Sequence, residues 1–86
     1  MRELIAVETR LNADGELLPQ SFYWSGRRVR VFNHGRRWER DGQLHFLVQD
    51  DRQGTYELAF DPSEACWSLL RAPQDFGPAD HFPKFM

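Results

Sequence analysis

The sequence predicts an all-β protein with a single small domain, and three observations support this prediction. Many segments are rich in β-branched and aromatic residues, short turn signals separate them, and no stretch of about eleven residues has helical periodicity. A chain of 86 residues can build only one core. We therefore expect one antiparallel meander of about six strands, of SH3-like size, which is strongly curved or closed in part into a barrel.

Four turns divide the chain. Residues 12–15, 39–42 and 51–54 each end in glycine, and two of these turns begin with Asn or Asp, which favour the first position of a type I turn. A left-handed glycine would close each of them as a three-residue hairpin loop. Ser25-Gly26 predicts a fourth, two-residue loop. We expect a hairpin at each turn.

The segments between the turns are predicted as strands: 3–11, 17–24, 27–33, 36–39, 43–50, 55–60 and 65–71. Alternation in two of them, joined by the turn at 51–54, predicts one shared apolar face. That face carries Leu44, Phe46, Val48, Tyr56, Leu58 and Phe60, and is extended by Trp67 and Leu69.

The Ser25-Gly26 loop fixes the register of the central hairpin, because it pairs Trp24 with Arg27 and each earlier residue with a later one. The predicted core face carries Phe22, Trp24, Val29 and Val31. The opposite face carries Ser21, Tyr23, Arg28, Arg30 and Phe32.

Pairing residues outward from the turn 12–15 in the same way places Ile5, Val7 and Leu11 on the face of Tyr23. This placement conflicts with a sheet that has one apolar side. Pro19 cannot donate a hydrogen bond to a ladder. We therefore expect a bulge or bend at residues 17–19, which restores the alternation and helps the sheet to curl.

Residues 1–72 are predicted as the β domain and 73–86 as an irregular tail, because three prolines in the tail preclude a regular element. Two alternatives remain for the tail. It is a flexible end, or Phe76, Phe82 or Phe85 docks on the sheet.

The sequence predicts neither a membrane span nor a signal peptide, and Cys66 is the single cysteine. We therefore expect a cytoplasmic protein. Metal binding, a cofactor and catalysis are not expected, because His34, His45 and His81 lie far apart and no phosphate-binding glycine loop or nucleophile context occurs.

The distribution of charge is the main functional signal. Residues 27–40 contain six arginines and one acid, a net charge of +5, whereas the rest of the chain carries −7. Arginine pairs with phosphate and stacks on bases, and exposed aromatic rings stack on single strands. The candidate nucleic-acid-binding residues are Tyr23, Arg28, Arg30, Arg36, Arg37 and Arg40.

Other interpretations of this cluster stay open. A solvated strand face often carries arginine, and cross-strand packing against acids would explain it without a ligand. The second functional hypothesis is a protein-interaction adaptor or a homodimer, which uses a sheet edge, the arginine face against an acidic protein surface, or the Phe-rich tail.

Several motifs resemble those of a small bacterial family of unknown function. They are the hairpin 22–31 with its pattern W-x-G-R-x-x-x-V, then Trp38, Tyr56-Glu57-Leu58 and Trp67-Ser68-Leu69. The resemblance covers residues 4–72, and the chain departs from the pattern at Val29, where an aromatic residue is commoner. It implies no catalytic residues. It implies a role near DNA repair, because such domains occur alone or appended to translesion DNA polymerases.

Overall fold

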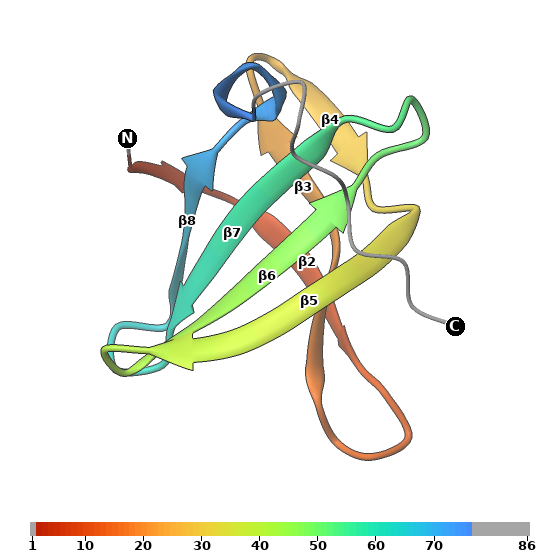
Figure 1. Cartoon of the computed structure of the whole chain (residues 1–86). Helices are drawn as coiled ribbons and strands as arrows, with labels where there is room; N and C mark the ends of the chain where they lie inside the picture. Colours follow the sequence, from red (N-terminus) through yellow and green to blue (C-terminus); the bar gives the residue numbers. More distant parts are fainter. Residues whose placement is uncertain (1, 77–86) are drawn as a thin grey trace.

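The computed structural model describes residues 2–76, and these residues form an all-β fold with one short 3-10 helix (Figure 1). Eight strands follow one another along the chain: β1 (Glu3–Ile5), β2 (Val7–Leu11), β3 (Leu17–Trp24), β4 (Arg27–Arg30), β5 (Asn33–Arg40), β6 (Gln43–Gln49), β7 (Thr55–Asp61) and β8 (Cys66–Arg71). The 3-10 helix η1 spans Pro73–Asp75.

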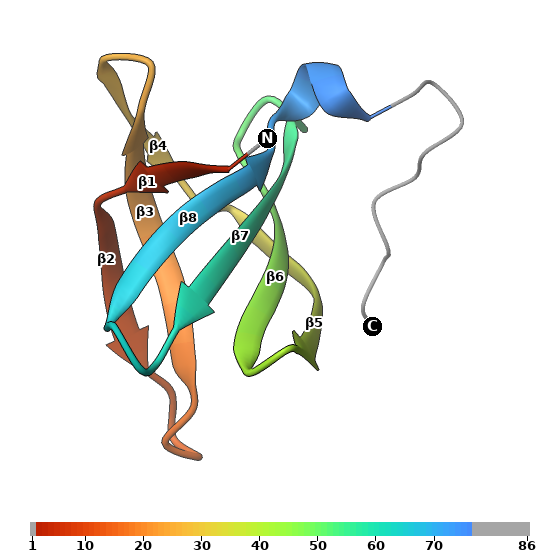
Figure 2. The same ribbon diagram turned by 90° about the vertical axis from the view of Figure 1, so that its left-hand side faces the viewer.

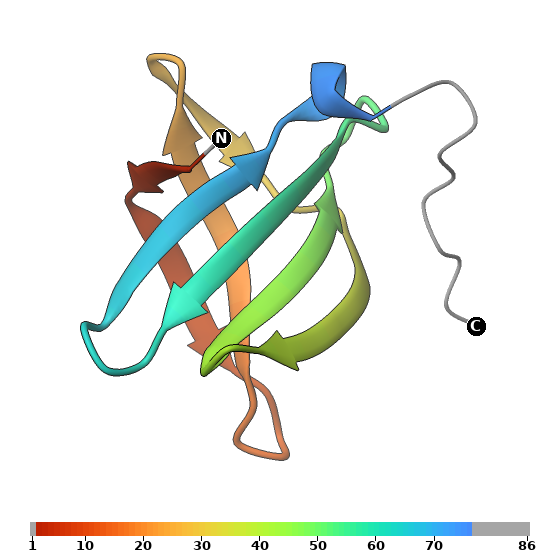
Figure 3. The ribbon, with the colours of Figure 1, turned by 60° about the vertical axis from the view of Figure 1, so that its left-hand side comes forward.

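The strands form two antiparallel sheets. The larger sheet has the order β1-β8-β7-β6-β5, and the smaller has the order β2-β3-β4. The strands of the larger sheet run obliquely across those of the smaller sheet (Figure 3), so the two sheets enclose one core between them. The prediction of a small, curved, antiparallel all-β domain is confirmed.

Two segments bend and pass from one sheet to the other. The first bends at Ala6, so that β1 pairs with β8 and β2 pairs with β3 (Figure 2). The second bends at residues 31–32, so that β4 pairs with β3 and β5 pairs with β6. The predictions of single strands over 3–11 and 27–33 were therefore wrong. With each bent segment counted once, the meander has the expected number of strands.

The core forms where the two sheets face each other. Phe22 and Val29 come from the smaller sheet and are 0% and 2% exposed. Tyr56 of the larger sheet meets them, because its ring lies edge-on to Phe22 with the ring centres 5.1 Å apart. Trp24 contacts the same tyrosine ring at 5.8 Å. The predicted register of the central hairpin and the predicted shared apolar face of β6 and β7 are both confirmed.

The predicted change of parity in β3 is present, one residue beyond the predicted segment. Glu8 is opposite Ser21 and Thr9 is opposite Pro19, which leaves Gln20 as the extra residue of a bulge. The bulge allows Val7 to lie opposite the buried Phe22. Leu11, beyond the bulge, is 67% exposed and lies outside the core.

The glycine turns form hairpins, but only the first closes as expected. Gly15 is left-handed, with a φ of 79°. The turn 39–42 is a two-residue loop, because Arg40 pairs with Gln43 and both intervening residues have positive φ. In the turn 51–54, Gln53 is the left-handed residue. A side chain at Gly54 would be crowded, because a Cβ atom would lie 3.0 Å from a carboxylate oxygen of Asp50 and 3.1 Å from Cγ of Pro73.

The first residues of the predicted tail pack against the domain. The Asp75 carboxylate accepts a hydrogen bond from the Ala72 N–H at 2.8 Å. The Arg71 guanidinium lies 4.2 Å from the ring centre of Phe76. The docking predicted for Phe82 and Phe85 falls outside the described residues.

The β3–β4 loop provides a test of the fold. Ser25 and Gly26 have φ values of 55° and 77°, which identify a type I′ turn. Serine is strained in this conformation, whereas asparagine adopts it readily. We expect Ser25→Asn to raise the free energy of unfolding by about 0.5–1 kcal/mol, measured by urea denaturation. A loss of stability would show that the turn has another conformation.

Candidate functional site

Tyr23, Arg28 and Arg30 share the outer face of the smaller sheet, as predicted. Arg28 is already partnered, because its guanidinium forms a salt bridge of 2.8 Å with Glu8. Ser21 on the same face is 1% exposed and donates its hydroxyl to Glu8. The hydrogen bond from Ser21, followed by that from Arg28, lowers the pKa of the Glu8 carboxyl.

The other three predicted site residues belong to β5 and the larger sheet. Arg36 lies over the ring of Trp38, at 5.2 Å from its centre. Arg37 forms a salt bridge of 2.7 Å with Glu16 and lies over the Phe46 ring. Arg36 and Arg37 are consecutive residues of β5, so their side chains point to opposite faces of the strand.

The structure therefore does not bring the six predicted residues to one surface. Arg40, near the end of β5, makes only a loose and exposed contact with Asp41 at 3.9 Å. The bend at residues 31–32 separates β4 from β5, so alternation along the chain cannot carry one face from β4 into β5.

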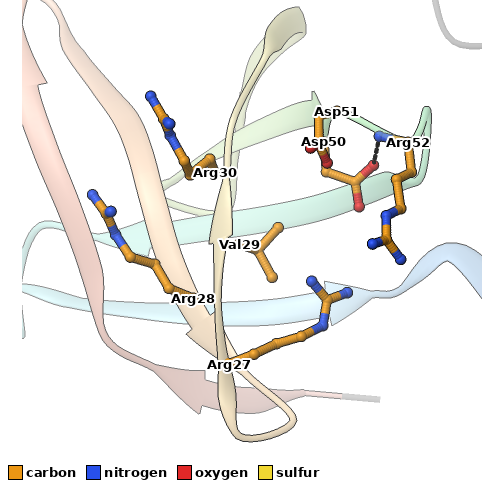
Figure 4. Close-up of a pocket in the computed structure, with 7 residues that line it drawn as sticks. All are labelled: Arg27, Arg28, Val29, Arg30, Asp50, Asp51 and Arg52. Atoms are coloured by element: carbon orange, nitrogen blue, oxygen red, sulfur yellow. Dashed lines mark hydrogen bonds between the residues drawn. The ribbon is translucent and has the colours of Figure 1, made fainter.

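A different set of residues lines a hollow of about 180 Å³ beside β4, an edge strand of the smaller sheet. We call this the arginine hollow; it is lined by Arg27, Arg28, Val29, Arg30, Asp50, Asp51 and Arg52. Figure 4 shows Arg28 and Arg30 extending from one side of β4, whereas Arg27 and Val29 extend from the other side, toward Asp50 and Arg52. Strand β4 therefore forms one wall, and the turn after β6 forms the other.

The Asp50 carboxylate holds the second wall in place. One oxygen accepts hydrogen bonds from the backbone N–H groups of Arg52 and Gly54, at 2.9 and 2.8 Å. The other oxygen accepts the hydroxyl of Tyr56 at 2.9 Å. Asp50 is 8% exposed, so these bonds offset the cost of burying its charge. The turn is thereby tied to the core through Tyr56.

This environment changes the pKa of Tyr56. Burial, with the hydrogen bond to Asp50 and the charge of that carboxylate, raises the pKa of Tyr56 to about 12. The nearby Arg27 guanidinium acts in the opposite direction and is the weaker influence. The phenol therefore stays protonated and donates to Asp50 at neutral pH.

Three arginines of the hollow have no carboxylate within salt-bridge distance among residues 2–76: Arg27, Arg30 and Arg52. Asp50 is committed to the bonds described above, and Asp51 is exposed. The lining residues comprise four arginines and two aspartates in a chain of net charge −2, and because Arg28 and Arg30 extend from the other side of β4, the positive charge lies along both sides of this strand. This arrangement suits a carboxylate or another anion.

Sequence reasoning missed Arg27 and Arg52 as candidate residues. Arg27 occupies a core-facing position, and only its place at the end of the hairpin brings its charge to the rim of the core. Arg52 lies in a turn that no local pattern connects to β4. The order of strands in space would have been needed to find this pair.

The remaining polar clusters suit structural roles. His45 is bonded to Glu57 at 2.9 Å, and Glu57 also accepts a hydrogen bond from Arg71 at 2.8 Å. Within residues 2–76, no group of three or more His, Cys, Asp or Glu side chains could hold a metal ion. Cys66 is a half-buried free thiol.

No family model, curated protein or solved structure matches the chain. The resemblance to the bacterial family and its link to DNA repair therefore stay predictions. Over the described residues, no helix has the length and apolar character needed to cross a membrane.

The Asp50–Tyr56 bond predicts a loss of stability at alkaline pH. The pKa of Tyr56 is higher in the folded state than its ordinary value of 10, so its contribution is complete below pH 10 and is lost as the pH rises through about 12. We expect Tyr56→Phe to lower stability at neutral pH by about 1–3 kcal/mol and to reduce the alkaline loss. Urea denaturation at a series of pH values measures both effects.

The matched control is Tyr23→Phe, because Tyr23 is 48% exposed. This variant should keep the alkaline loss of the parent protein. If Tyr56→Phe showed the same alkaline loss as the parent, the account of the Asp50–Tyr56 bond would be wrong.

Proposed function

We propose that this chain is a non-catalytic binding module that takes an acidic segment of a partner protein at the arginine hollow. The observation that carries the proposal is the excess of unpaired arginine around a concave site in an acidic chain. Arg30 is available to a carboxylate beside β4 without displacing a carboxylate partner among the described residues, and Arg27 and Arg52 add positive charge nearby. We place this binding in the cytoplasm, as the sequence predicts.

An acidic protein segment suits this surface better than a nucleic acid does. Affinity for nucleic acid grows with the number of phosphates that a protein neutralises. The arginines of residues 27–40 are divided between two sheets, and Arg28 and Arg37 are bound to Glu8 and Glu16. A short acidic segment can be bound by the few arginines at this site. A nucleic acid requires a longer row of cations, because several phosphates must be neutralised.

One observation favours single-stranded nucleic acid as the second candidate. Tyr23 and Phe32 are 48% and 63% exposed, and the first lies on the same sheet face as Arg30. Exposed rings beside arginine offer stacking surfaces for bases. The same experiment can compare the two ligands.

The test uses a fluorescein-labelled peptide, Thr-Glu-Val-Glu-Thr, titrated with the full chain at about 50 mM salt, where charge interactions are strong. Fluorescence anisotropy should show saturable binding. Arg30→Glu and Arg52→Glu should each weaken the affinity by about tenfold or more, because each replaces an attraction with a repulsion. Circular dichroism confirms that each variant is folded.

The matched control is Arg40→Glu, since Arg40 is exposed and lies outside the hollow. Its affinity for the peptide should equal that of the parent protein. Absence of peptide binding, or an equal effect of all three substitutions, would refute the proposal. Tighter binding of an oligothymidine of about 20 nucleotides, weakened by Tyr23→Ala, would favour the nucleic-acid function instead.

A further inference from the structure

Strand β4 is an edge strand of the smaller sheet. The turn that precedes it determines which of its peptide groups bond to β3. In the type I′ turn, the residues on either side of Ser25 and Gly26 are Trp24 and Arg27, which form a hydrogen-bonded pair. Bonded and non-bonded pairs alternate along an antiparallel ladder, so Phe22 and Val29 form the next bonded pair.

The peptide groups of Arg28 and Arg30 consequently point away from β3. The hydrogen bond from Val31 N–H to the Gln20 carbonyl, 3.0 Å long, agrees with this alternation, because it is the next bonded position. Among residues 2–76, β4 has no pairing partner other than β3. Each of the two arginines therefore offers one N–H and one C=O at a free edge.

The arginine hollow adjoins this edge. Arg27 and Val29 reach into it from β4, and Arg52 reaches into it from the opposite wall (Figure 4). Arg28 and Arg30 lie on the other side of the strand. A strand that paired with β4 would meet both groups, because its successive side chains point to opposite faces.

We propose that the partner's acidic segment binds as an added antiparallel strand along β4. This inference rests on the proposed function and states its mode of binding. Backbone groups of Arg28 and Arg30 pair with two alternate residues of the segment, as in other complexes that form by strand addition. The segment thereby satisfies four peptide groups that β3 leaves free.

The side chains of β4 define which segment fits. Residues opposite Arg28 and Arg30 share their face, so acidic residues are favoured at these two positions, where Arg28 would be shared with Glu8 and Arg30 has no carboxylate partner among residues 2–76. The residue between them faces the hollow beside Val29, where a small apolar side chain would contact the apolar surface of Val29. The expected core of the segment is acidic, small apolar, acidic.

Charge also selects against a second copy of this chain at the same edge. Pairing of two β4 strands would place the arginines of one copy opposite those of the other, and directly opposed like charges destabilise a ladder. Charged side chains commonly protect edge strands from self-association in this way. The edge therefore accepts an acidic segment and repels its own copy.

The test changes the peptide and leaves the protein unaltered, so folding of a variant is not in question. In an antiparallel added strand, the two Glu residues of Thr-Glu-Val-Glu-Thr direct their N–H groups at β4, and the Val residue directs its N–H away. N-methylation of both Glu residues should weaken binding by about tenfold or more, since it removes two hydrogen bonds. N-methylation of Val should leave the affinity within about twofold.

Heteronuclear NMR supplies the second readout. The unmethylated peptide should shift the amide signals of residues 27–30 and 50–53, and the peptide methylated at Val should shift the same signals. If the unmethylated peptide binds but both methylated peptides bind equally, strand addition is wrong while the proposed function stands. If the unmethylated peptide does not bind, the proposed function itself fails.

Discussion

The structure depends on two segments that bend and change sheets. The bends at Ala6 and at residues 31–32 let a short meander enclose its own core, because each bent segment contributes a strand to both sheets. The second bend has a further effect. It carries the chain away from β3 and into the larger sheet, so β4 is only four residues long and its outer edge stays unpaired. The free edge is thus a consequence of how this small core closes.

The Asp50 carboxylate connects that edge to the core. It fixes the turn after β6 through two backbone N–H groups and joins the turn to Tyr56, whose ring contacts Phe22 and Trp24. The wall of the arginine hollow that faces β4 is therefore anchored to the core. A preformed site of this kind loses less conformational entropy on binding than a flexible loop would. Stability and binding share one set of contacts here.

Local patterns predicted much of the fold and little of the site. Alternation and turn residues were sufficient for the register of β3 with β4 and for the shared apolar face of β6 and β7, since each depends on neighbours in sequence. They could not reveal the bend at Ala6, because Ile5 and Val7 are both apolar and either sheet suits them. Arg28 and Arg30 were placed on the correct face, whereas the separation of Arg36 and Arg37 from that face follows from the change of sheet at residues 31–32. Arg52 joins the hollow only through tertiary structure.

The central claim is that the peptide groups of Arg28 and Arg30 are free at the edge of β4, and amide hydrogen exchange of the unbound protein tests it most directly. Under native conditions the Arg28 and Arg30 amides should exchange rapidly, and the Arg27 and Val29 amides, which alternate with them, should exchange slowly, because the latter are bonded within the ladder. Equally slow exchange of all four amides would show that the edge is already occupied and would contradict the account.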